Sequence, residues 1–226
     1  MVLAFRVSAV PKTKKTLISA RKAPTQARAV RLVADILEAA ARVLAREGAR
    51  RFTTERVAEE AGVSIGSLYQ YFPSKEALLF RLQTDEWSET WAVVEEILND
   101  PALAPLDRLR KAVLAFFRSE QQEAALRTAL DDAGALFRDA PEARAFLERT
   151  RASVASFFEE ALPSVPPRER TLAADVVLTA MGATAEEVTA QGLDRRAVDE
   201  WAKASADMYC AYLESVTRRA EARKTR

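Results

Sequence analysis

Apolar residues recur every three or four positions along most of the chain after residue 25, which is the spacing of one face of an α-helix. The first such stripe consists of Ala29, Val33, Ile36, Ala40 and Val43. Gly48 follows it, where a helix C-terminal cap is expected. No segment alternates apolar and polar residues over a sustained length, so no sheet is predicted. The pattern predicts an all-α fold.

Two short helices are predicted directly after this first one. Thr53 is a good N-cap for a helix over residues 54–61, and Gly62 can adopt the left-handed conformation of a tight turn. Ser64 then caps a second short helix that ends near Phe72. A longer helix followed by two short capped helices is typical of a helix-turn-helix DNA-binding domain.

The rest of the chain shows helical periodicity interrupted by Pro, Gly and Asn-Asp breaks. The predicted helices are Lys75–Asn99, Leu106–Glu120, Glu123–Phe137, Pro141–Leu162, Pro167–Gln191 and Asp194–Arg219. We predict a basic flexible leader (1–24), a DNA-binding domain (25–75, with the helix-turn-helix at about 53–72), a ligand-binding and dimerisation domain (76–220) and a basic tail (221–226).

Composition fits a soluble globular chain of 226 residues, with 49% hydrophobic and 30% charged residues and a net charge of +1. The charge is unevenly distributed along the chain, since eight Lys and Arg and no Asp or Glu precede Asp35. This basic leader could contact DNA phosphates or could be a solvated extension, and both interpretations stay open.

Histidine is absent and Cys210 is the single cysteine. An intrachain disulfide is therefore impossible, which fits a reducing compartment, and imidazole catalysis and imidazole metal ligands are excluded. We predict no metal, no cofactor, no catalytic residue and no enzyme activity. No run is long and apolar enough to span a membrane, and the charges follow the apolar start rather than precede it as in a secretory signal. A cytoplasmic location is expected, with an organelle transit peptide as the alternative for the acid-free leader.

The second short helix has an unusual outward face. Val63, Leu68 and Phe72 are its natural inward residues. A solvated helix would carry Lys and Glu on the other face, whereas here small and polar residues accompany one isoleucine: Ser64, Ile65, Gly66, Ser67 and Gln70. Such a face suits the major groove, where Gln70 could pair with an adenine edge and Ile65 could touch a thymine methyl.

Residues 53–79 closely resemble the DNA-binding domain of the tetracycline-repressor (TetR) family. The signature Ala-Gly-Val-Ser-x-Gly-x-Leu-Tyr-x-Tyr-Phe-x-Ser-Lys-Glu-x-Leu-Leu runs from Ala61 to Leu79. The resemblance implies that Tyr71 and Lys75 contact phosphates and that Tyr69 contacts the DNA backbone or a thymine methyl. It also implies contacts from the start of the first short helix, at Thr53 and Thr54. Three acids near these positions are expected to face away from DNA: Glu55, Glu59 and Glu60.

The resemblance further implies a homodimer that binds a palindromic operator in double-stranded DNA and responds to a small molecule. Small and apolar residues of the last two helices are the predicted dimer interface: Ala180, Ala183, Trp201, Ser205, Met208 and Tyr212. Aromatic and polar residues of the middle helices are the predicted effector site: Trp87, Trp91, Phe117, Gln122, Arg127, Phe137 and Phe157. The effector is then expected to be apolar or aromatic. The alternatives are an activator, a regulator controlled by a protein partner and an all-α enzyme.

Overall fold

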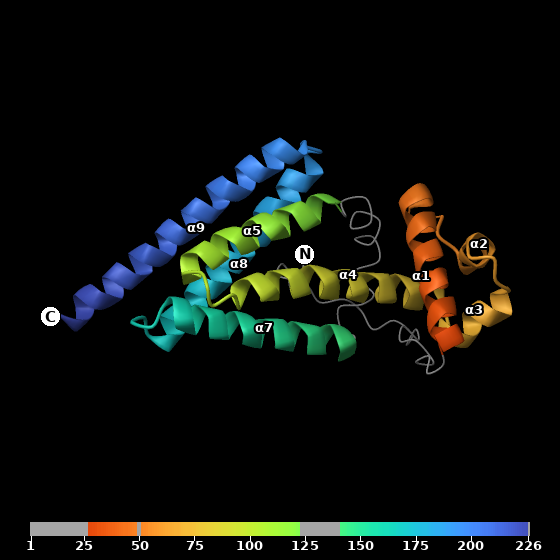
Figure 1. Cartoon of the computed structure of the whole chain (residues 1–226), viewed down its shortest axis with the longest axis horizontal. Helices are drawn as coiled ribbons and strands as arrows, with labels where there is room; N and C mark the ends of the chain where they lie inside the picture. Colours follow the sequence, from red (N-terminus) through yellow and green to blue (C-terminus); the bar gives the residue numbers. More distant parts are fainter. Residues whose placement is uncertain (1–26, 49–50, 123–140, 226) are drawn as a thin grey trace, which may run out of the picture. The chain divides into compact units, whose positions relative to one another are not determined.

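The computed structural model describes residues 27–48, 51–122 and 141–225. Every regular element in these ranges is an α-helix, which confirms the predicted all-α fold (Figure 1). The helices are α1 (Ala27–Glu47), α2 (Thr54–Glu60), α3 (Ile65–Tyr71), α4 (Lys75–Leu98), α5 (Pro105–Gln122), α7 (Pro141–Ala161), α8 (Pro167–Ala190) and α9 (Arg195–Lys224). The predicted leader and the predicted helix Glu123–Phe137 lie outside the described residues.

The described residues form two compact units. The first contains residues 27–48, 51–88 and 141–144, and the second contains residues 89–122 and 145–225. The predicted boundary between a DNA-binding and a ligand-binding domain at residue 75 stays a prediction. Among the described helices, none is long and apolar enough to cross a membrane.

Helix α1 buries the stripe that its periodicity predicts. Val33, Ile36, Ala40 and Val43 are buried, and Ala29, the first residue of the predicted stripe, is half-buried. Gly48 ends the helix with a φ of 72°, and its N–H donates to the Leu44 carbonyl at 2.8 Å. Helix α1 packs on α2, which in turn packs on α3, so this stripe holds the helix-turn-helix in place (Figure 1).

The core of the second unit lies among α5, α8 and α9, which pack side by side (Figure 1). Small residues let α8 and α9 approach closely, among them Ala173, Ala185 and Ala202, each no more than 1% exposed. Helix α9 continues to Lys224, five residues beyond its predicted end at Arg219. The buried Ala220 and an Arg223–Glu169 hydrogen bond of 2.6 Å to α8 hold this extra turn, so the start of the predicted basic tail is helical.

A buried arginine that the sequence did not single out joins three helices of this unit. Arg108 of α5 is 3% exposed and donates to the Leu98 carbonyl at the end of α4 at 2.7 Å. It also pairs with Glu160 of α7 and lies 5.8 Å from the centre of the Phe157 ring. A cation at a helix C-terminus is favoured by the helix dipole. Pairing with the Glu160 carboxylate offsets the desolvation cost of the buried guanidinium.

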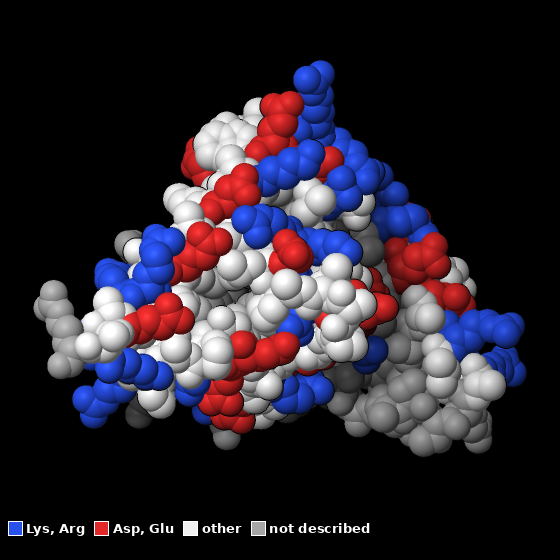
Figure 2. All heavy atoms as spheres, turned by 60° about the vertical axis from the view of Figure 1, so that its left-hand side comes forward, with Lys and Arg blue, Asp and Glu red and all other residues white. Residues whose placement is uncertain are grey.

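On the face drawn in Figure 2, basic and acidic side chains are interspersed over most of the area. The net charge of +1 gives no overall excess of one sign, so a DNA contact has to be located from particular residues rather than from overall charge.

The ion pair between Arg118 of α5 and Asp199 of α9 is bidentate, with both N–O distances at 2.7 Å. It holds the pKa of the Asp199 carboxyl below the ordinary 3.8. A carboxyl with a lowered folded-state pKa adds stability above its unfolded pKa and loses it as the pH falls through the folded value. We therefore expect Asp199→Asn to lower the melting temperature at pH 7, with a difference that shrinks on acidification below 3.8. An equal difference at every pH in calorimetry would contradict this.

Candidate nucleic-acid interface

The turn between α2 and α3 is built by local capping. The Thr53 hydroxyl accepts the Arg56 N–H at 3.3 Å at the start of α2. At its end, Gly62 has a φ of 67°, and the Val63 N–H donates to the Ala58 carbonyl at 3.0 Å. This is a Schellman cap, which a residue with a side chain would strain. The cap fixes the direction in which α3 leaves the turn.

Helix α3 is anchored at both ends. The Ser64 hydroxyl accepts the Ser67 N–H at 3.1 Å and lies 2.8 Å from the Ser67 hydroxyl, so it caps the helix as predicted. Leu68 and Phe72 are buried at 0% and 1% exposure, and Val63 is half-buried. These apolar contacts leave the opposite face of the helix turned to solvent.

The outward face of α3 contains no charged residue. Ser64, Gly66 and Gln70 are exposed, and Ser67 is half-buried. Ile65 and Tyr69 are each 38% exposed although both are large and mainly apolar. A helix face with hydrogen-bonding groups and exposed apolar atoms can meet base edges and thymine methyls in a major groove.

Thr54, one of the predicted DNA contacts, is largely buried. It is only 6% exposed, and its hydroxyl lies 3.0 Å from the Tyr69 hydroxyl. The bond joins the start of α2 to α3, and it fixes where the Tyr69 ring points. The contact of Thr54 with DNA stays a prediction, and its hydroxyl also helps to position Tyr69.

Two of the three nearby acids are turned toward arginines. Glu60 accepts hydrogen bonds from Arg42 at 2.9 Å and from Arg46 at 3.1 Å, which hold the pKa of its carboxyl below the ordinary value. Glu59 and Glu60 line a surface hollow whose other lining residues are also charged: Arg46, Glu47, Arg51 and Arg56. The contacts with Arg42 and Arg46 place Glu60 on the side of α2 that faces α1.

Glu55 behaves differently from the other two acids. It is exposed in the first turn of α2, where a carboxylate is favoured by the helix dipole, and its carboxylate is 3.4 Å from the Thr54 hydroxyl. The charge is therefore beside the Thr54–Tyr69 pair rather than turned to α1.

The start of α4 lies directly after α3. The Ser74 hydroxyl accepts the Ala77 N–H at 3.2 Å and caps the helix, and Lys75 is exposed in its first turn. Tyr71, at the end of α3, is half-buried. A lysine and a phenol hydroxyl at this position can both donate to phosphate oxygens.

Family models match both halves of the chain. The model described as bacterial regulatory proteins of the tetR family matches residues 36–82, and that of the tetracyclin repressor-like C-terminal domain matches residues 104–216, half of the chain. The chain belongs to the TetR family of bacterial regulatory proteins. Its α2–turn–α3 segment is thus the helix-turn-helix of a DNA-binding transcriptional regulator.

Individual relatives agree with the TetR assignment. The chain is 29% identical over 144 residues to the HTH-type transcriptional repressor KstR of Rhodococcus jostii, covering 64% of this chain and 66% of KstR. It is 38% identical over 85 residues to the nucleoid occlusion factor SlmA of Aliivibrio fischeri, covering 36% of this chain and 43% of SlmA. The chain spans less than two thirds of the length of either relative.

Solved structures of TetR regulators share the fold. A TetR-family transcriptional regulator from Mesorhizobium loti has a TM-score of 0.67 at 20% identity and covers 83% of this chain and 98% of its own. The ketosteroid transcriptional regulator KstR2 of Mycobacterium tuberculosis has a TM-score of 0.52 at 21% identity. The match covers 84% of this chain and 94% of the KstR2 chain.

The second unit of this TetR chain exposes an apolar face on α8 and α9. Leu172 and Val176 of α8 are 60% and 43% exposed, and Trp201 and Met208 of α9 are 45% and 56% exposed. Of the other residues predicted at the dimer interface, Ala183 is exposed and Ala180 and Tyr212 are half-buried. Ser205 is 5% exposed inside the subunit, because its side of α9 packs within the core, so we remove it from the predicted set.

The predicted aromatic effector residues that the structure describes are buried or pack against a core. Phe117 and Phe157 are buried in the core of the second unit, Trp91 packs against that core, and Trp87 is buried in the first unit. Gln122 is exposed at the end of α5. Arg127 and Phe137 lie outside the described residues.

Cys210, the one thiol of the chain, is completely buried, and burial raises its pKa, which disfavours the nucleophilic thiolate. Within the described ranges, no group of three or more His, Cys, Asp or Glu is placed to hold a metal ion.

The position of Glu55 gives a testable consequence for DNA affinity. Glu55→Gln removes a negative charge next to the Thr54–Tyr69 pair, so we expect duplex DNA of any sequence to bind a few-fold more tightly at low salt. The gain should shrink as salt is added. Glu60→Gln is the control on the α1 side of α2, where the Glu60 carboxylate accepts hydrogen bonds from Arg42 and Arg46. Equal behaviour of the two variants in fluorescence anisotropy would show that Glu55 does not face DNA.

Proposed function

We propose that this chain is a homodimeric transcriptional repressor that binds a palindromic operator and releases it when a small molecule binds. The observation that carries the proposal is the outward face of α3, which is uncharged, capped in a fixed direction and rich in groups suited to base edges. Membership of the TetR family supports the same conclusion.

In this proposal α3 enters the major groove. Gln70 pairs with an adenine edge, Ile65 touches a thymine methyl, and Gly66 and Ser67 permit close approach. Tyr71 and Lys75 donate to phosphates and set the register of the helix. Thr54 helps to position Tyr69 through the bond between their hydroxyls.

Dimerisation supplies the second half-site. A single recognition helix binds weakly, and helix-turn-helix dimers read two half-sites about 34 Å apart or more. Exposed large apolar side chains on neighbouring helices are the usual mark of a subunit interface. We propose that α8 and α9 pack against the same helices of a second subunit through the face that contains Leu172, Val176, Trp201 and Met208.

Release of DNA is proposed to follow from effector binding among the aromatic residues of the second unit, with Trp91, Phe117 and Phe157 as the apolar lining and Gln122 and Arg127 as polar partners. The effector is apolar or aromatic. It favours a conformation in which α4 moves and the two α3 helices no longer match the half-site spacing. Only a difference in its affinity for the two conformations can drive this shift.

Selection from a random duplex library, followed by sequencing, tests the proposal. Wild-type protein is expected to enrich a palindromic motif. Gln70→Ala should lose preference at one base pair in each half-site, because one bidentate contact discriminates by about 1–3 kcal/mol. An identical motif from both proteins would remove Gln70 from the base contacts, and no motif at low salt would contradict sequence-specific binding.

A further inference from the structure

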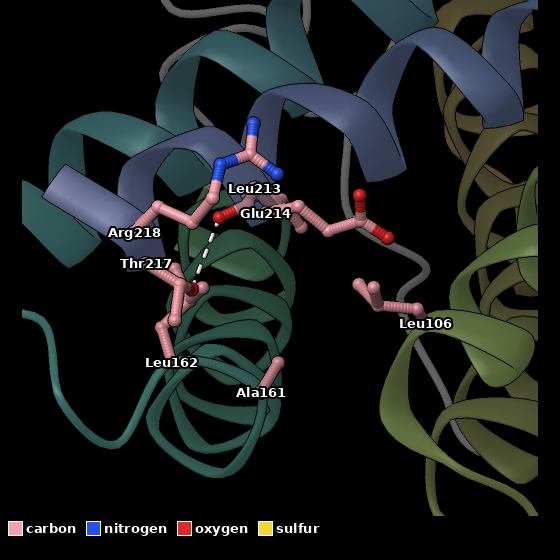
Figure 3. Close-up of a pocket in the computed structure, with 7 residues that line it drawn as sticks. All are labelled: Leu106, Ala161, Leu162, Leu213, Glu214, Thr217 and Arg218. Atoms are coloured by element: carbon pink, nitrogen blue, oxygen red, sulfur yellow. Dashed lines mark hydrogen bonds between the residues drawn. The ribbon is translucent and has the colours of Figure 1, made fainter. Parts of the chain in front are cut away.

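A pocket opens at one end of the second unit, among α5, α7 and α9 (Figure 3). Its volume is about 320 Å³, and in the described part of the chain seven residues line it: Leu106, Ala161, Leu162, Leu213, Glu214, Thr217 and Arg218. None of them belongs to the proposed DNA contacts, the proposed effector site or the exposed α8–α9 face. The pocket is therefore a separate feature that the proposed function does not use.

The floor of the pocket is apolar and comes from three helices. Leu162 of α7 and Leu213 of α9 are 1% and 0% exposed, and Leu106 of α5 is half-buried. The floor is thus part of the packed core and has a fixed shape. A ligand that fills it must bring an apolar body, since apolar contact is the main gain available there.

The mouth of the pocket has one anionic and one cationic side chain. Glu214 and Arg218 are exposed and lie one turn apart on α9, and Glu214 extends toward Leu106 (Figure 3). A Glu four residues before an Arg is the favourable order for an ion pair on a helix. Within the described residues, however, neither Glu214 nor Arg218 takes part in an ion pair within 4.0 Å.

The remaining polar group of the lining is the Thr217 hydroxyl, whose proton is already donated within α9. The Thr217 hydroxyl donates to the Leu213 carbonyl at 3.0 Å, the dashed line in Figure 3. The charges of Glu214 and Arg218 are thus the groups at this pocket that a ligand can pair with.

We propose that this pocket binds a small zwitterion with an apolar side chain, of the class of the hydrophobic α-amino acids. The ligand carboxylate pairs with Arg218, its ammonium pairs with Glu214, and its side chain rests on the three leucines. A simple carboxylate would leave Glu214 without a partner and close to a like charge, and a simple amine would do the same to Arg218. The volume is at the lower end of the roughly 300–1,000 Å³ of small-molecule pockets, which fits a ligand of this size.

Titration with L-leucine, followed by calorimetry and by the melting temperature of the full chain, tests the site. We expect saturable binding and a melting temperature that rises with leucine concentration, because a ligand that binds only the folded state stabilises it. Glycine lacks the apolar body, 4-methylpentanoate lacks the ammonium and 3-methylbutylamine lacks the carboxylate. Each should bind at least about tenfold more weakly than leucine.

Charge-neutral variants locate the binding. Arg218→Gln and Glu214→Gln should each weaken leucine binding by about tenfold or more, while Arg219→Gln, an exposed neighbour outside the pocket, should not. All three positions are exposed on α9, so the variants should fold. Absence of saturable binding at about 10 mM leucine would overturn the proposal. Equal binding of the carboxylate or the amine, or equal loss in Arg219→Gln, would overturn it as well.

Discussion

Replacing Trp201 by Arg is expected to convert the protein from a dimer to a monomer. Trp201 is 45% exposed on α9 beside the similarly exposed Met208, and large aromatic residues dominate the energy of most interfaces. An arginine there would place a charge from each subunit in the apolar centre of the interface without a partner, which is strongly unfavourable. Because one subunit supplies one recognition helix, operator affinity should fall by about 100-fold or more.

Size-exclusion chromatography with light scattering measures the oligomeric state directly. Lys203→Glu is the matched control, since it changes an exposed charge on another side of α9. The control should stay dimeric and Trp201→Arg should not. Dimers of Trp201→Arg at micromolar concentration would locate the interface elsewhere on the molecule.

Replacing Gly66 by Ala should stabilise the protein and weaken its binding to DNA. An added Cβ at this position meets only the Ser64 Oγ at 3.9 Å, an ordinary contact, and the backbone is not in the left-handed region. Alanine in a helix is favoured over glycine by about 0.5–1 kcal/mol, so the melting temperature should rise. The methyl group would separate α3 from the groove, and we expect operator affinity to fall by about tenfold.

Gly62→Ala should lower the melting temperature, where Gly66→Ala raises it, and is therefore the control for Gly66→Ala. Gly62 has a φ of 67°, and an alanine there would be strained and would destabilise the turn. Thermal unfolding and anisotropy with the selected operator separate the two effects. Unchanged DNA affinity in the more stable Gly66→Ala protein would show that this part of α3 does not approach DNA closely.

The features that the sequence predicts well depend on residues close together along the chain. The caps at Thr53 and Ser64, the turn at Gly62 and the stripe of α1 follow from local hydrogen bonding and helical period, and the structure confirms each of them. Helix ends are less determined: α9 continues past Arg219 because of a contact with α8 that no local pattern reveals.

The features that the sequence did not predict depend on tertiary contacts. The bond between the Thr54 and Tyr69 hydroxyls spans 15 residues, and the burial of Arg108 depends on α4 and α7. Ser205 has the same spacing as Trp201 and Met208 on α9, and only packing decides that it faces the core. Leu172 and Val176 are both apolar at a spacing of four on α8, so the sequence indicated that they share one apolar helix face. Helical period alone does not tell whether such a face packs in the core or forms an interface.

If two α3 helices of a dimer read one duplex together, the spacing of the half-sites must control affinity. The measurement compares affinity for the selected palindrome with affinity for the same palindrome carrying about 5 extra central base pairs, half a helical turn. We expect two copies per duplex by native mass spectrometry on the first and a large loss of affinity on the second. Undiminished affinity for the lengthened site would show that each subunit binds on its own and would rule out joint reading by a dimer.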